Sequence, residues 1–154
     1  MDTILIQLQN AVAQIKNNQN EIAFRYVDEN WGQLDLYGRE IPVQWPAVLI
    51  TLKNADYSNN GRNFNKVPML RQEGMLMVEF TVANLKLTNS SFKAPVGQKN
   101  DAFEIWRLVE ELHKAIHGLE INFGKMIRQN MVSVKRDDGV QEVRVVYSLA
   151  LSDC

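Results

Sequence analysis

The sequence predicts an α+β fold in which two helices cover one face of a mainly antiparallel sheet, in the order α-β-β-β-α-β-β. Two segments, 2–16 and 101–118, repeat apolar residues at the three- and four-residue spacing of one helical face. Other runs alternate apolar and polar residues or are continuously apolar, as strands are. Asp137-Asp138-Gly139 joins the last two runs, and an Asp-Gly pair between extended segments indicates an antiparallel hairpin.

Length and composition favour one soluble domain spanning residues 1–154. Hydrophobic residues make up 45% of the chain and charged residues 23%, close to globular averages. The net charge of -1 creates no field that would favour nucleic acid, an acidic substrate or a membrane surface. The single cysteine, Cys154, cannot form an internal disulfide. No signal peptide or apolar stretch of ~20 residues is recognisable, so we expect a protein made for a reducing cytoplasm.

The first half of the chain predicts one helix and two strands. Apolar residues from Leu5 to Ile15 form the stripe of the first helix, and the asparagine-rich segment 17–20 ends it. The first strand, 22–27, alternates large residues with smaller or polar ones. An irregular excursion is expected at 28–39. The second strand, 47–52, is a continuous apolar run, which is typical of a strand buried on both faces.

Two long polar loops flank the longest predicted strand, 74–87. The first loop, 54–73, combines asparagines, a glycine and three basic residues with few apolar side chains. The second loop, 88–100, contains Pro95 and Gly97. Loops of this length inside a compact domain are commonly functional, or become ordered when they meet a partner. Both loops are therefore predicted to carry contacts with other molecules.

The helix at 101–118 is predicted to organise the fold, because its apolar stripe needs a sheet to cover. Asp101 followed by Glu104 matches a capping box at its first turn. Gly118 stands where a left-handed residue would end the helix. Two strands, 126–136 and 140–151, then form the closing hairpin, and the second has one fully apolar face. The helical stripe consists of Ile105, Leu108, Val109, Leu112 and Ile116.

Only one pair of residues has the spacing of a metal site. His113 and His117 lie four residues apart on the predicted helix, a spacing at which two imidazoles can share a metal. A small metal-binding or enzymatic domain using these histidines is therefore an alternative. No third ligand pattern, nucleophile elbow or glycine-rich phosphate loop accompanies them, so a helix end with favourable charge–dipole contacts is the preferred interpretation. We expect no cofactor and no catalytic residues.

The basic loop and the tryptophans are the candidate contact residues. Basic and aromatic residues interleave between 57 and 71, a combination that could track single-stranded nucleic acid. Three cations are few for that role, so we favour a loop that becomes ordered on a protein surface. Two tryptophans lie in irregular segments, where they could anchor an interface or pack locally. The candidates are Trp31, Trp45, Tyr57, Arg62, Phe64, Lys66 and Arg71.

The order of these elements resembles that of the tail terminator and tail-completion proteins of long-tailed bacteriophages and prophages. Those proteins have an N-terminal helix, a mainly antiparallel sheet, a helix before the last hairpin and long polar loops. The matching stretches here are DTILIQLQNAVAQIK, WPAVLITL, GMLMVEFTVANL, DAFEIWRLVEELHKAIHG and MVSVKRDDGVQEVRVVYSLAL. The resemblance covers nearly the whole chain through its architecture rather than through a motif of fixed residues.

This resemblance implies a non-enzymatic structural protein at the head–tail junction. Such a protein is expected to form a ring of six subunits. The ring would cap the tail tube and offer a surface to the head connector. It would be made in the cytoplasm of a bacterial host and end in the virion tail. Exposed sheet edges and long loops suit this role, because they become buried only in the assembly.

Overall fold

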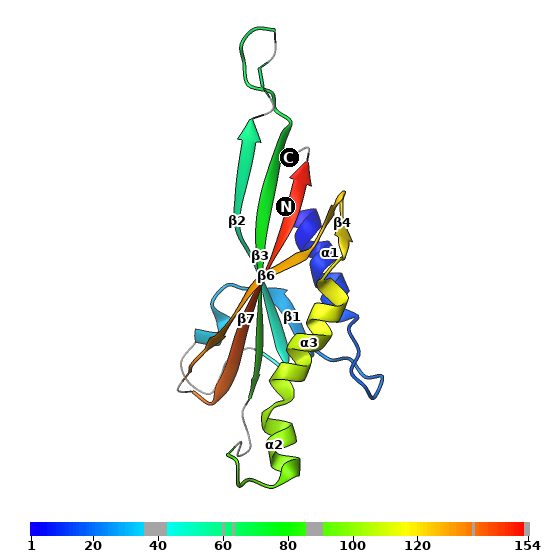
Figure 1. Cartoon of the computed structure of the whole chain (residues 1–154), viewed down its shortest axis with the longest axis vertical. Helices are drawn as coiled ribbons and strands as arrows, with labels where there is room; N and C mark the ends of the chain where they lie inside the picture. The colour runs from blue at the N-terminus through cyan, green and yellow to red at the C-terminus, as the bar shows by residue number, and fades with distance from the viewer. Residues whose placement is uncertain (36–42, 60, 63, 86–90, 137, 153–154) are drawn as a thin grey trace.

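The computed structural model describes residues 1–35, 43–59, 61–62, 64–85, 91–136 and 138–152. Its main sheet has five strands in the order β1-β2-β3-β7-β6 (Figure 1). All neighbours are antiparallel except β1 and β2, which are parallel. The predicted α+β fold with a mainly antiparallel sheet is therefore confirmed. The strands are β1 (Tyr26–Glu29), β2 (Ala47–Asn59), β3 (Gln72–Leu85), β6 (Ile127–Val134) and β7 (Val140–Ser152).

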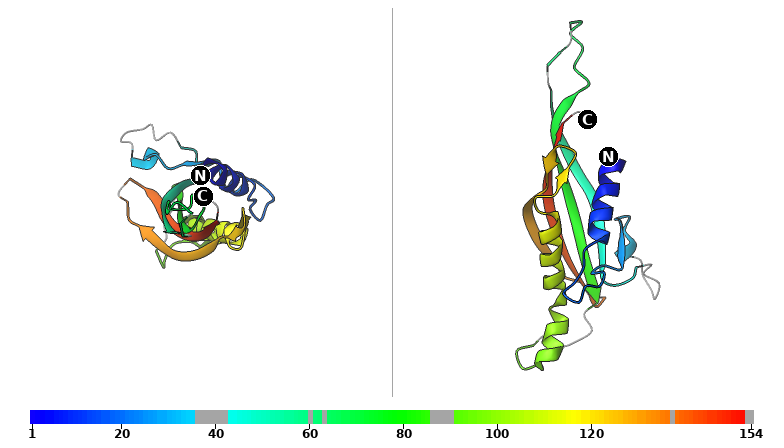
Figure 2. Two further views of the ribbon diagram at one scale, coloured as in Figure 1. Left: turned by 90° about the horizontal axis from the view of Figure 1, so that it is seen from above. Right: turned by 90° about the vertical axis from the view of Figure 1, so that its right-hand side faces the viewer.

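Two helices cover one face of this sheet, as predicted. Helix α1 (Asp2–Ala13) and helix α3 (Glu104–Ile116) lie side by side over it, and the short α2 (Val96–Ala102) precedes α3 (Figure 2). All five stripe residues predicted for the second helix are buried. They pack on the apolar faces of β3 and β7, where Phe80 and Tyr147 meet edge to face with ring centroids 5.5 Å apart. Burial of this apolar surface is the main source of stability.

The opposite face of the sheet has a cover of its own at one end. There a 3-10 turn, η1 (Gln33–Asp35), places Leu34 over Leu49, Ala83 and Val140, which form a second, smaller cluster. The predicted excursion at 28–39 is therefore partly a structural cover, although residues 36–39 lie outside the described residues. No helix among the described residues is long and apolar enough to cross a membrane.

Both bounds of the loop predicted at 54–73 are wrong. Strand β2 continues to Asn59 and β3 begins at Gln72, and the two pair directly, with Asn59 opposite Gln72. The sequence of 54–59 suggested a loop, because it is mostly polar and only Ala55 packs against the core. Ladder hydrogen bonds to β3 hold it as a strand nonetheless. The connection is therefore the shorter segment 60–71.

The predicted helix at 101–118 is also divided differently. Helical structure begins at Val96, so the predicted loop 88–100 is shorter, and α3 starts only after Phe103. The Asp101–Glu104 capping box does not form: Asp101 lies inside α2, and the N-terminus of α3 has no side-chain cap. Gly118 does adopt a positive φ of 80° just beyond the helix, as predicted for a left-handed terminating residue.

Two further corrections concern short strands. The strand predicted at 22–27 is displaced to Tyr26–Glu29, because only those residues align with β2, whereas Ile22 forms a single bridge with Lys16 and is exposed. A small hairpin after α3 was not predicted. It pairs β4 (Glu120–Ile121) with β5 (Gly124–Lys125), and strands of two residues are too short to show periodicity.

One arginine ties the η1 turn to the β6–β7 hairpin. Arg136 donates from Nη2 to the carbonyl oxygen of Leu34 at 2.6 Å and from Nη1 to Asp35 at 3.1 Å. The same guanidinium binds Asp138 at 2.7 Å and Glu142 at 2.9 Å. Since a planar guanidinium presents five donors in a fixed fork, one side chain can hold four acceptors. The second cluster therefore depends on a polar clamp as well as on apolar contacts.

The clamp pairs the two arginines Arg136 and Arg144 with three carboxylates, Asp35, Asp138 and Glu142. The Glu142 side chain is 1% exposed, and its second oxygen accepts from Arg144 Nε at 2.7 Å. The hydrogen bond with Asp138 raises the pKa of Arg136, and the same bond lowers the pKa of Asp138. Both groups therefore stay charged at neutral pH.

Replacing Arg136 by lysine tests the clamp. A lysine keeps the charge but not the fork, so Arg136→Lys should lower the free energy of unfolding by roughly 1–3 kcal/mol. Urea denaturation measures it. Lys114→Ala removes exposed ion pairs to Glu110 and Glu111 and should cost less than ~0.5 kcal/mol. Equal, small losses in both variants would contradict the clamp.

Candidate functional site

The most prominent surface feature is an arm that projects from one end of the sheet (Figure 1). It consists of the outer halves of β2 and β3 and the connection between them. The connection has a defined shape, because Arg62 bridges to Pro68 and the Met69 amide donates to the carbonyl oxygen of Gly61 at 3.1 Å. Lys66 adopts a positive φ of 62°. We call the described residues of segment 61–71 the arm tip.

The arm tip presents apolar side chains to solvent. Phe64 and Leu70 are 102% and 93% exposed, and Val67 and Met69 are also exposed. Contiguous apolar surface rimmed by polar groups marks interaction sites in soluble proteins. Segment 60–71 contains three basic residues and no acidic one. The tip is therefore an apolar and positively charged surface at the end of a rigid ladder.

The structure gathers five of the seven predicted contact residues on the arm and places the two tryptophans elsewhere. Trp31 is exposed near η1, where its indole donates to Asp28 at 3.3 Å. Trp45 is partly buried and packs against the second cluster. The arm carries Tyr57, Arg62, Phe64, Lys66 and Arg71, all of them exposed. The prediction omitted Val67, Met69 and Leu70, although three apolar residues so close together in a polar segment were a usable signal.

The two histidines are engaged with neighbours inside the fold. His113 Nδ1 lies 3.0 Å from the hydroxyl of Tyr147, and His117 Nδ1 accepts from the backbone N–H of Arg128 at 3.2 Å. Their rings lie next to each other, tilted by 37° with centroids 4.7 Å apart. In the part of the chain that the structure describes, no cluster of three His, Cys, Asp or Glu residues is placed to hold a metal. The pair joins α3 to the sheet.

The surroundings of His113 make it a pH-sensitive contact. Burial, followed by the positive charge of Arg128, lowers the pKa of His113 below its ordinary 6.5. Burial raises the pKa of Tyr147 to about 12, so its hydroxyl is protonated and can donate to the neutral imidazole. Protonation of Nδ1 would replace this acceptor by a donor.

The stability of the protein should therefore fall as the pH falls. Because the folded-state pKa of His113 is depressed, the unfolded chain binds a proton first, and stability present above pH ~6.5 is lost below it. His113→Gln should lose less stability than the wild type between about pH 7.5 and pH 5.5. Urea titrations across this range measure the slopes. Identical slopes would contradict the assignment.

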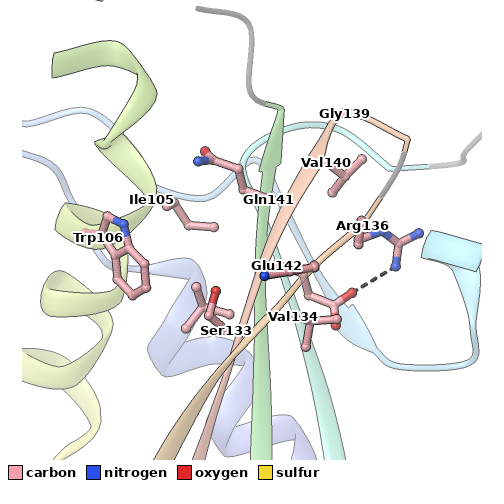
Figure 3. A pocket seen from close by; sticks show the side chains of 11 residues that line it. Ile105, Trp106, Ser133, Val134, Arg136, Gly139, Val140, Gln141 and Glu142 are labelled. Carbon is pink, nitrogen blue, oxygen red and sulfur yellow. Dashed lines mark hydrogen bonds and ion pairs between the residues drawn. The ribbon is translucent and has the colours of Figure 1, made fainter. Parts of the chain in front are cut away.

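A groove of about 390 Å³ lies between α3 and the β6–β7 hairpin. Figure 3 shows Ile105 and Trp106 on its helix side and Ser133 and Glu142 on its strand side. Glu142 is held by Arg136 and Arg144, so both of its carboxylate oxygens are engaged in ion pairs. The half-exposed indole and the small residues opposite offer a shape into which an apolar side chain could pack.

A comparison with solved structures shows where this fold occurs. The chain superposes on a chain of the "Virion of native gene transfer agent (GTA) particle" with a TM-score of 0.51 and 9% identity, covering 96% of this chain and 91% of that one. No protein-family model and no curated protein matches the sequence. At 9% identity, the likeness shows a shared fold.

Proposed function

We propose that this chain is a structural subunit of a phage or prophage virion, a tail terminator or tail-completion protein that forms a ring at the head–tail junction. The observation that carries this proposal is the likeness to a virion chain over nearly the full length of both proteins. The order of elements, which resembles that of tail terminators, supports it independently. The partners are other copies of the chain, the tail tube and the head connector.

The arm supports the proposal because it has the features of a docking element. Aromatic residues, methionine and arginine are enriched in the buried centres of protein interfaces. The arm tip combines Phe64, Met69 and Arg62 in exposed positions. A ring would carry one such tip per subunit, and several weak contacts made together bind far more tightly than one. We assign the tip to contact with an axial partner, the tail tube or the connector.

Removing the apolar tip should abolish partner binding without harming the fold. The double variant Phe64→Ser/Leu70→Ser should change the free energy of unfolding by less than ~0.5 kcal/mol, because both side chains are fully exposed. It should lose co-sedimentation with tail tubes built from the tube protein of the same genetic element. Phe123→Ser, at an equally exposed site on the β4–β5 turn, is the matched control and should retain binding. Retained binding by the tip variant would refute this role.

The ring itself is tested by the mass of the purified protein. Light scattering, alone and with tail tubes present, should show a closed oligomer of about six times the 17.7 kDa of one chain. Electron microscopy of the same sample should show rings. A monomer at every concentration would contradict the ring. Stoichiometric metal lost in His113→Ala/His117→Ala, or salt-sensitive binding of single-stranded DNA, would favour the alternative functions.

A further inference from the structure

Strand β6 forms an edge of the sheet that lacks the usual protection. Its eight residues include Ile127, Met131 and Val132, which are 51%, 48% and 54% exposed. Arg128 is its single charged residue, and it contains no proline. Soluble proteins shield such edges with lysines, prolines, covering loops or very short strands, because an apolar edge with unpaired backbone groups recruits another strand. Edge β6 has little of this shielding: one register shift, and the side chain of His117, which accepts from the backbone N–H of Arg128 near one end of the strand.

The opposite edge of the same sheet is protected. Strand β1 has only four residues, two of them the acidic Asp28 and Glu29. The Gln9 side chain of α1 donates to the carbonyl oxygen of Val27 at 3.1 Å, which occupies a backbone group of this strand. The contrast between the two edges favours β6 as the edge that pairs with a strand of another molecule.

A second open segment exists beyond the end of β1. Pairing between β1 and β2 stops at Glu29 and Ile50. Strand β2 continues to Asn59, and no described strand pairs with its outer side over 51–59. This open segment of nine residues matches the eight residues of β6 in length. It also carries both Lys53 and Asp56, so it presents no excess of positive charge to Arg128.

We propose that β6 of one copy pairs antiparallel with the open segment 51–59 of β2 in the next copy, so that the sheet continues across the subunit boundary. This inference rests on the ring of the proposed function and names the surfaces that join it. The direction follows from the topology, since β6, β7, β3 and β2 are successive antiparallel neighbours. Two different surfaces meeting head to tail generate a ring when the rotation closes.

Register and face also agree with this joint. Met131 pairs with Val145, Val145 with Phe80, and Phe80 with Ile50. Met131 and Ile50 therefore lie on the same line across the sheet. Met131 and Ala55 both lie on the helix-covered face, because their ladder partners belong to the main core. Placing Met131 opposite Ala55 therefore keeps the two faces continuous. In this register, β6 of the neighbouring copy pairs with β2 beyond the four residues that β1 occupies, so β6 and β1 do not overlap.

The offset that this pairing needs is one that closed sheets adopt. Moving from Ile50 to Ala55 is a shift of four to five ladder positions, or about 15 Å at roughly 3.3 Å per residue. The four strand spacings from β2 to the next β2 span about 19 Å at roughly 4.8 Å each. The strands would thus tilt by roughly 35–40° from the ring axis, inside the range of closed barrels.

Disulfide trapping between differently tagged copies tests the joint. One protein carries Met131→Cys and the other Ala55→Cys or Tyr57→Cys, both in a Cys154→Ser background. Directly opposed antiparallel residues have Cα atoms roughly 4.5–5.5 Å apart, which suits a disulfide. We expect the mixture to form the Met131→Cys/Ala55→Cys or Met131→Cys/Tyr57→Cys heterodimer and neither protein alone to form a disulfide dimer. A double variant in one chain should give covalent oligomers up to the ring.

Three results would overturn the inference. Rings by light scattering without this disulfide would place the joint elsewhere and leave the proposed function standing. Disulfide dimers of Met131→Cys alone would show a symmetric β6–β6 contact. Monomers throughout would refute both the joint and the ring.

A charge on the edge provides a second, independent test. Val132→Lys should lower the thermal stability of the subunit only slightly, since the side chain is half exposed although its ladder partner is Arg144, and should weaken self-association by roughly tenfold or more. Ile22→Lys places the same charge at an exposed apolar site outside the sheet and should assemble normally. Normal assembly of Val132→Lys would count against the joint as well.

Discussion

The structure depends on a mismatch in length between its strands and its helices. Strand β3 has 14 residues and β7 has 13, so each spans about 45 Å at roughly 3.3 Å per residue. Helices α1 and α3 have 12 and 13 residues, or about 20 Å at 1.5 Å per residue. Two helices of that length cannot cover strands more than twice as long. One part of the sheet therefore has a complete core, and the remainder extends beyond it as a paired but thinly covered ladder.

The features assigned to assembly follow from that mismatch. The arm is rigid because the ladder between β2 and β3 continues as far as the arm tip. It is exposed because no helix reaches it. The clamp of Arg136 fastens the η1 turn over one end of the second face. Edge β6 borders a groove beside α3 and keeps three apolar side chains about half exposed. An isolated subunit thus carries surfaces that only neighbouring molecules can cover, as subunits of large assemblies do.

The sequence predicted the covered part of the fold well and the uncovered part poorly, and one cause explains both. Burial produces periodicity, so the spacing of Ile105, Leu108 and Leu112 was enough to place them on the inner face of α3. The segment 54–59 is a strand mainly through backbone pairing, with Ala55 its one side chain packed against the core, which leaves too weak an apolar pattern to recognise. Phe64 and Arg62 were found because they lie in a polar connection. The openness of β6 was not predictable, since alternation along a strand does not say which strand, if any, lies beside it.

Hydrogen exchange on the isolated subunit and on the assembled ring tests the central claim most directly, namely that the uncovered ladder is completed by a neighbouring copy. Unpaired edge amides exchange quickly, and pairing protects them. The account predicts that amides of 51–59 and 127–134 slow on assembly, while those in the middle of β3 are protected in both states. Edge amides that exchange equally fast in subunit and ring would contradict it.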